Sequence, residues 1–185
     1  MDPHSPNTHR LDLSPADGPE LRQRFIQAMG KVAASVTLVT TDGGVGRFGQ
    51  TVTAMMSVSA DPPTLVIGLF RGVPVADAVR TNRCFAVNIL SGQDIPVAQA
   101  FAGQADPSTL YKFDENWTSL RTGSPIRTTA AAAFDCHAEQ FLVAGSHLLI
   151  VGRVVDAVAG SADPLTYHAR SYGHHVPMDL LKGNS

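Results

Sequence analysis

The chain has 185 residues, which is enough for one domain whose core needs no disulfide or metal to hold it together. Fourteen basic and 16 acidic residues give a formal net charge of −2 without any basic run, so nucleic acid is not expected as a partner. No apolar run is long enough to span a membrane and the first residues lack a signal pattern, so we expect a cytoplasmic protein that does not associate with a membrane.

Polar, proline-rich and glycine-rich sequence at the start of the chain is typical of a segment that buries little. We therefore expect a flexible N-terminal tail over residues 1–18, a single domain over 19–176 and a C-terminal tail over 177–185. Pro19 suits a first helical turn. Apolar residues then recur at helical spacing before Gly30, namely Leu21, Phe25, Ala28 and Met29. This pattern predicts a short amphipathic helix that docks on the core.

Most of the remaining chain shows strand patterns, either alternating or continuously apolar, bounded by turn residues. These strands are expected at 35–41, 49–60, 64–70, 84–90, 130–142, 147–158 and 164–167. Helical spacing predicts short helices at 75–79 and 94–102. Turns are expected at 42–44 and at 143–146, so several neighbouring strands should form hairpins.

Six or seven strands with few helices favour an antiparallel sheet, because a parallel sheet needs a helix after nearly every strand. We therefore expect a mainly β fold, a small barrel with peripheral α-helices. The sequence has no Gly-x-Gly-x-x-Gly between a strand and a helix and no Walker loop. A bound nucleotide would therefore not lie in a Rossmann crevice.

The segment 49–60 is unusual because four hydroxyl side chains share one alternating face of a predicted strand. This face holds Thr51, Thr53, Met55, Ser57 and Ser59. The other face is apolar and is expected to face the core, with Val52, Ala54, Met56, Val58 and Ala60. The hydroxyl face suits either a polar, uncharged ligand or a simple exposed strand surface.

Cysteine and histidine residues give no metal or redox motif. Cys84 and Cys136 lie in apolar surroundings without a CxxC pair, so we expect buried free thiols. His168, His174 and His175 cluster near the end of the chain, but no further ligand stands at metal-binding spacing. No metal site is expected.

Several separated segments are specific when their order and spacing are taken together. They are VTLVTT at 36–41, TVTA at 51–54 followed by SVSADPP at 57–63, FAVNIL at 85–90, AQAFAG at 98–103 and GSH at 145–147. With these segments the chain resembles the short-chain flavin reductase family from about Phe25 to Tyr172. It is particularly similar to the small reductase components that supply reduced flavin to separate aromatic-ring monooxygenases.

The resemblance implies an antiparallel split β-barrel of Greek-key type and an NAD(P)H:flavin oxidoreductase that passes hydride from NADH to FAD or FMN. Direct transfer between two stacked rings needs no protein nucleophile or general base. NADH is preferred to NADPH because no arginine cluster marks a 2′-phosphate pocket. The resemblance also implies a homodimer and a separate oxygenase component that receives reduced flavin by diffusion. A flavin-binding electron carrier or storage protein is the alternative function, and a purely structural barrel is a third.

By resemblance, flavin contacts fall on Gly49, Gln50, Thr51, Thr53, Ala54, Gly68, Leu69, Phe70, Arg71, Val75, Ala100 and Phe101. Arg71 and the helix that begins near Val75 would bind phosphate, although Arg71 also fits a solvated surface arginine. Phe101 fits the core equally well, because it shares the apolar spacing of its helix with Val97. Thr51, Thr53 and Ala54 are expected to touch the flavin, whereas Ser57 and Ser59 shape the strand.

The nicotinamide side of the site is implied at His147, His168, Arg170 and Tyr172. His147 is the expected catalytic residue, with a positioning role, although a structural turn histidine is the alternative. Many relatives have Asp before this histidine where this chain has Ser146. Arg170 would meet a pyrophosphate and Tyr172 would cover a ring, unless they are only a surface arginine and part of a C-terminal strand.

Overall fold

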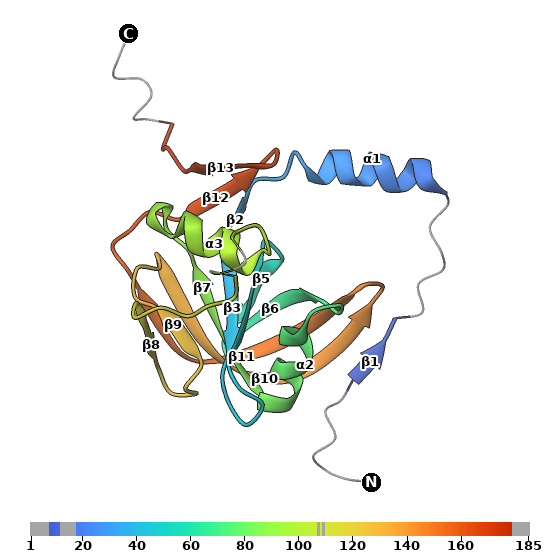
Figure 1. The fold of residues 1–185 in the computed structure, drawn as a ribbon. Coiled ribbons are helices and arrows are strands. Elements are labelled where there is room, and N and C mark those ends of the chain that lie inside the picture. The colour runs from blue at the N-terminus through green and yellow to red at the C-terminus, as the bar shows by residue number, and fades with distance from the viewer. Residues whose placement is uncertain (1–7, 12–17, 107, 109, 179–185) are drawn as a thin grey trace.

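The computed structural model describes residues 8–11, 18–106, 108 and 110–178, and its main element is one large, mostly antiparallel sheet (Figure 1). The strands of this sheet are β1 (Thr8–Arg10), β3 (Thr37–Thr41), β4 (Phe48–Val52), β5 (Met55–Ala60), β6 (Pro63–Phe70), β7 (Cys84–Ile89), β10 (Ala132–Ala144) and β11 (His147–Ala159). They follow the order β4-β3-β7-β10-β11-β6-β5, and β1 pairs with β10 in parallel. The mainly β, antiparallel fold class is confirmed.

Smaller elements surround the large sheet. The remaining strands are β2 (Ala34–Ser35), β8 (Trp117–Ser119), β9 (Pro125–Arg127), β12 (Leu165–His168) and β13 (Ser171–His174). The helices are α1 (Pro19–Met29), α2 (Pro74–Asn82), the 3₁₀ turn η1 (Gly92–Asp94) and α3 (Ile95–Phe101). The pairs β8–β9 and β12–β13 are hairpins, and β2 adds to β12. The predicted helices and strands are present, except that the strand expected at 49–60 is two strands, β4 and β5; β1, β8, β9 and β13 were not predicted.

The large sheet curls because its two edge strands, β4 and β5, are consecutive in the chain. Only Thr53 and Ala54 separate them. The Gly68 amide donates to the Ala54 carbonyl at 2.9 Å, so β6 lies against this bend. The curl therefore brings the ends of β4 and β6 to one place.

Helices α2 and α3 seal two separate apolar clusters of the core. Val75 and Val79 of α2 are buried with side chains of the sheet that include Phe85. Ala98 and Phe101 of α3 are buried with Leu38 and other residues in a second cluster. Both helices begin with proline in the first turn, where a missing amide hydrogen costs nothing.

The prediction that the first helix docks on the core is wrong. Helix α1 has the expected bounds, but none of its residues is buried, and it extends away from the sheet (Figure 1). Phe25 is 62% exposed and Met29 is 50% exposed. The apolar spacing correctly predicted an amphipathic helix, but spacing within one segment does not determine which surface covers the apolar face.

The predicted faces of the segment 49–60 are also wrong in its second half. The bend at Thr53 and Ala54 interrupts the alternation, and a bulge follows between Ser57 and Ser59 in the pairing of β5 with β6. As a result, Met55 packs against the core, whereas Met56 is 60% exposed and Val58 is 53% exposed. Strand β5 is a sheet edge, so part of its apolar surface has no covering element.

A buried ion pair connects η1 to β9. Arg127, 8% exposed, pairs with Asp94 at 3.0 Å and with Asp114 at 2.6 Å. Asp94 also accepts hydrogen bonds from Ser91 and from the Thr129 hydroxyl. Burial by itself would raise the pKa of Asp94, but the hydrogen bonds from Thr129, Ser91 and Arg127 outweigh it and hold that pKa below its usual value.

The two cysteines and the lengths of the helices can be compared with the sequence-based predictions on thiols and membrane spans. Cys84 and Cys136 are buried and form no disulfide, as expected. Burial, with a smaller effect from neighbouring Asp135, raises the pKa of the Cys136 thiol. Among the described residues, no helix is long and apolar enough to cross a membrane.

Candidate functional site

Three adjoining clefts follow strand β4 and the start of α2. The first, about 320 Å³, is lined by Val36, Gln50, Thr51, Val52, Thr53, Ala54, Gly68, Phe70, Ala102, Gln104, His147, Tyr167 and Tyr172. The second, about 380 Å³, is lined by Arg47, Phe48, Gly49, Gln50, Thr51, Val73, Pro74, Val75, Phe101, Ala102 and Tyr111. The third, about 490 Å³, is lined by Val45, Phe48, Arg71, Gly72, Val73, Pro74, Asp77, Ala78 and Thr81. Shared residues join neighbouring clefts into one groove.

The junction between the first and second clefts contains an unused hydrogen-bond acceptor. Gln50 lines both clefts, and its buried side-chain oxygen Oε1 has no hydrogen-bond partner. A buried oxygen without a partner costs about 1–3 kcal/mol, so a ligand that donates to it would recover that cost. The neighbouring Thr51 hydroxyl is already engaged, because it donates to the Ala98 carbonyl at 2.9 Å. Thr51 therefore ties β4 to α3, and Gln50 is the free polar group.

Small residues give the groove its shape. A Cβ atom at Gly49 would lie 2.9 Å from the Phe101 ring, so only glycine lets this ring approach β4 so closely. A Cβ atom at Gly68 would lie 3.1 Å from the Cβ of Ala54. The two glycines therefore allow close packing within the wall of the groove, of β4 against the Phe101 ring and of β6 against Ala54.

His147 lines the first cleft and begins β11 opposite Phe70 in the pairing of β11 with β6. The two rings meet edge to face, with their centroids 5.8 Å apart. The His147 Nδ1 atom lies 2.9 Å from the Ser146 hydroxyl oxygen. The backbone amide of Arg71 donates to the Ser146 carbonyl at 3.0 Å, and Arg71 Nη1 donates to the Gly145 carbonyl at 3.3 Å.

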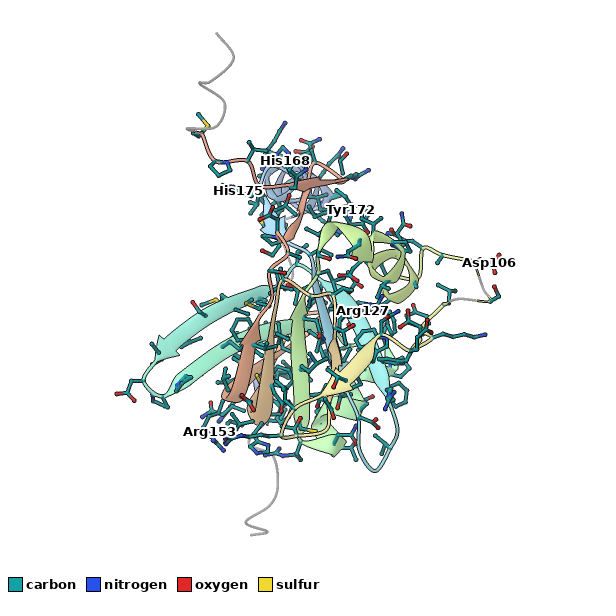
Figure 2. All side chains as sticks on the ribbon, turned by 90° about the vertical axis from the view of Figure 1, so that its left-hand side faces the viewer. Asp106, Arg127, Arg153, His168, Tyr172 and His175 are labelled. Atoms are coloured by element: carbon teal, nitrogen blue, oxygen red, sulfur yellow. The ribbon has the colours of Figure 1, made fainter. Side chains whose placement is uncertain are left out.

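The β12–β13 hairpin contributes aromatic side chains to the lining of the first cleft. Tyr167 and Tyr172 pair across the hairpin, with ring centroids 5.4 Å apart, and both line the cleft. Burial, with a smaller effect from Tyr167, raises the pKa of the Tyr172 hydroxyl. Figure 2 shows His168 and Tyr172 at the end of the molecule that carries this hairpin, with Arg153 at the opposite end.

Most of the predicted site residues line this groove. The structure brings together Gly49, Gln50, Thr51, Thr53, Ala54, Gly68, Phe70, Arg71, Val75, Phe101, His147 and Tyr172. The side chain of Leu69 is instead buried in the core, and Ala100 lines a fourth cleft, which meets the second at Phe101. His168 and Arg170 are exposed and line none of these clefts.

Several residues of the groove were not predicted. In the first two clefts they are Val36, Arg47, Phe48, Val73, Ala102, Gln104, Tyr111 and Tyr167. Tyr167 carried a signal, since it alternates with Leu165 on a predicted strand. Gln104 and Tyr111 lie in the irregular segment after α3, where no period indicates which way a side chain points.

The polar groups that line the groove determine which kind of bound group it suits. Among the described residues, no three His, Cys, Asp or Glu side chains are grouped so as to hold a metal ion. The free Gln50 oxygen, the Thr53 hydroxyl and the aromatic side chains of the first cleft fit a planar ring system that carries an N–H donor. The isoalloxazine ring of a flavin has these properties.

Solved structures with the same fold include flavin reductases. The flavin reductase PheA2 superposes with a TM-score of 0.76 at 30% identity, covering 84% of this chain and 98% of that one. BorF, the flavin reductase component of a bacterial two-component tryptophan halogenase, gives a TM-score of 0.73 at 26% identity, covering 83% of this chain and 97% of BorF. Fold and groove thus define a protein of the flavin reductase class.

Sequence comparison identifies the family. The flavin reductase like domain matches residues 29–175, and the chain belongs to this family. The FMN reductase (NADH) RutF of Bradyrhizobium diazoefficiens is 36% identical over 151 residues, 81% of this chain and 83% of that protein. RutF of Pseudomonas syringae pv. syringae is 36% identical over 156 residues, 84% of this chain and 86% of that protein. The predicted family and enzyme class, an NAD(P)H-dependent flavin reductase, are confirmed.

Proposed function

We propose that this protein is an NADH:flavin oxidoreductase that transfers hydride from NADH to FMN or FAD and releases the reduced flavin to a separate oxygenase component. Relatives named as NADH-dependent FMN reductases support the reaction. BorF, named as the reductase component of a two-component halogenase, supports a separate acceptor enzyme. When bound, the flavin supplies a ring that accepts hydride from a reduced nicotinamide.

One observation carries this proposal. The first cleft joins the β4 segment, the end of β6, the start of β11 and the β12–β13 hairpin. Its lining includes the unpartnered acceptor Gln50 of β4 together with His147 and Tyr172. A single cleft therefore offers both a polar cradle and aromatic walls to two stacked rings.

The residues of β4 would hold and orient the flavin. Gln50 Oε1 would accept a hydrogen bond from a ring N–H, which satisfies the buried oxygen. Thr53 and Ala54 lie in the bend that joins the sheet edges, and both line the first cleft. Thr51 contributes by holding α3 against β4. Phe101 forms an apolar wall of the second cleft.

The phosphate of the flavin would lie near Arg71 and the first turn of α2. Both border the third cleft, which joins the second at Phe48, Val73 and Pro74. Arg71 uses Nη1 to bind the Gly145 carbonyl, and its exposed guanidinium has further donors for an anion. The buried side chain of Leu69 would contribute to the site by shaping the end of β6.

The nicotinamide would enter from the His147 and Tyr172 side of the first cleft. His147 would orient the ring through its imidazole, and Tyr172 would cover one face. Arg170 and His168 lie on the exposed side of the hairpin, where they would meet the pyrophosphate in contact with solvent. A ligand in this position also excludes water from the region between the two rings.

We further propose a cytoplasmic homodimer. The exposed apolar face of α1 and the exposed side chains of Met56 and Val58 on β5 support a surface that a second copy covers. The buried free thiols Cys84 and Cys136 suit a reducing compartment.

The reaction is tested by mixing purified protein with NADH and either FMN or FAD and following NADH absorbance. We expect flavin-dependent NADH oxidation well above the spontaneous rate, with lower activity on NADPH. Equilibrium dialysis with each flavin measures binding separately. Flavin binding without NADH oxidation would support the carrier function, and binding of neither ligand would refute the proposal.

A further inference from the structure

The imidazole of His147 is held by contacts on two sides. The Ser146 hydroxyl oxygen lies 2.9 Å from Nδ1, and the Phe70 ring packs edge to face at a centroid distance of 5.8 Å. Among the contacts found in the described part of the chain, neither the Ser146 hydroxyl nor His147 Nε2 has another hydrogen-bond partner. Nε2 is therefore the ring nitrogen that remains for a ligand in the first cleft, which His147 lines.

The turn that carries Ser146 is itself fixed to the end of β6. The Arg71 amide donates to the Ser146 carbonyl, and the Arg71 guanidinium donates to the Gly145 carbonyl. Gly145 has a φ of 55°, a left-handed conformation that glycine adopts without strain. These contacts fix the backbone of the turn at Ser146, which keeps its side chain within hydrogen-bond distance of the His147 ring.

We infer that Ser146 is a positioning residue that sets the tautomer of His147 by donating its hydroxyl hydrogen to Nδ1. With Nδ1 as acceptor, the neutral ring carries its proton on Nε2, which becomes a donor toward the cleft. The inference rests on the proposed function in one respect, since the acceptor for Nε2–H would be the carboxamide oxygen of the nicotinamide. The tautomer itself does not depend on that function.

The chemistry of serine makes this arrangement different from one with a carboxylate at the same position. An ionised carboxylate has no hydrogen to donate, so it can only accept from Nδ1–H. The neutral ring would then present Nε2 as an acceptor, with the opposite polarity toward the cleft. A serine hydroxyl permits the donor arrangement, and substitution by aspartate should reverse it.

Nuclear magnetic resonance of ¹⁵N-labelled protein without ligands tests the tautomer. The His147 ring signals are assigned by their loss in His147→Gln. We expect the Nε2–H form in the native protein, a mixture of tautomers in Ser146→Ala, and the Nδ1–H or doubly protonated form in Ser146→Asp. The Nδ1–H form in the native protein, or an unchanged pattern in Ser146→Ala, would overturn the inference.

Steady-state kinetics test the effect of the tautomer on the reaction. We expect Ser146→Ala to raise KM for NADH about five- to tenfold, the loss of one well-placed hydrogen bond, with KM for flavin within about twofold. Ser146→Thr keeps the hydroxyl and should restore KM for NADH. The exposed Ser161, which lines none of the three clefts, provides the control Ser161→Ala.

The two experiments separate failure of the inference from failure of the proposed function. If the native protein does not oxidise NADH, the proposed function fails, and the resonance experiment still decides the tautomer. If NADH is oxidised but Ser146→Ala leaves its KM unchanged, the positioning role is refuted while the reaction stands.

Discussion

At the scale of single residues, the hydroxyl side chains of the segment 49–60 have different tasks. Thr53 lines the first cleft, whereas Ser59 binds its own turn through the amide and carbonyl of Asp61. Thr51 also lines the cleft, but its hydroxyl donates a hydrogen bond to the Ala98 carbonyl. Residue type alone did not separate these roles. The role of Thr51 depends on its partner Ala98 in another element, and that of Ser59 depends on the turn at Asp61.

Substitution of Thr53 by valine should weaken flavin binding more than the same change at Ser59. The Thr53 variant loses a hydroxyl in the cleft, and we expect the Kd for flavin to rise about fivefold, equivalent to about 1 kcal/mol. Ser59→Val should leave the Kd unchanged and affect only the turn at Asp61. Fluorescence titration of both variants with FMN and FAD measures this. Equal losses at both positions would contradict the placement of the flavin beside Thr53.

Gly49 should tolerate alanine poorly because of its close approach to the Phe101 ring. The added Cβ would force this ring or β4 to move, and we expect a loss of about 1–3 kcal/mol in the free energy of unfolding. Gly44 is a matched control, because a Cβ there meets nothing within 4 Å. Urea denaturation of Gly49→Ala and Gly44→Ala gives the comparison. Equal stability of the two variants would show that the Phe101 ring can move aside without lowering the free energy of unfolding.

At the scale of elements, the site depends on how neighbouring segments are fastened together. The turn η1 and the strand β9 are linked by Asp94 and Arg127, and α3 continues directly from η1. Phe101 at the end of α3 packs against Phe113 and Trp117, and the Arg127 guanidinium lies over the Trp117 ring. The buried ion pair therefore supports the wall of the second cleft from behind.

The Asp94 carboxylate should make stability depend on acid pH. Its pKa in the folded protein is lowered, so its contribution is complete above its usual value of about 4 and is lost as pH falls below it. Asp94→Asn should cost roughly 3 kcal/mol at neutral pH, because it leaves Arg127 with a weaker buried partner. It should also reduce the further loss of stability between pH 6 and pH 3.

Urea unfolding at several pH values measures this effect, with Asp163→Asn at an exposed position as the control. The control should follow the native protein at every pH. A native protein whose stability does not fall below pH 4, or an Asp94 variant that falls just as steeply, would contradict the role of this carboxylate.

At the scale of the whole molecule, many of the exposed apolar side chains lie on two elements at the periphery of the fold, α1 and the edge strand β5. Helix α1 extends away from the sheet, and its side chains Phe25, Ile26 and Met29 are each more than 40% exposed (Figure 1). Strand β5 adds Met56 and Val58 at an edge of the sheet. A second copy of the chain is the proposed cover for this surface.

A charge on the apolar face of α1 should therefore weaken the dimer. We expect Phe25→Glu to shift the protein toward monomer, because burying an unpaired carboxylate is costly. Gln23→Glu adds the same charge on the opposite face of the helix and should leave the dimer intact. Light scattering coupled to size-exclusion chromatography measures both variants. A monomeric native protein, or a dimeric Phe25→Glu variant, would refute the use of this face.

The sequence by itself determined most strands and helices of this protein, because period and turn chemistry are local. The runs 64–70 and 84–90 gave β6 and β7, and Gly145 marked the hairpin between β10 and β11. Strands of three residues, such as β8 and β9, were not predicted, because they are too short to show an alternating pattern. The order of the motifs was sufficient to indicate the family, which sequence comparison confirmed.

Only the tertiary structure decided how these segments meet. The bend at Thr53 and Ala54 exposed Met56, and Leu69 and His168 were placed outside the groove. The contact between Ser146 and His147 depends on a turn that Arg71 holds from another strand. Such features come from pairings between residues far apart in the chain, and the periodicity of a single segment carries no information about them.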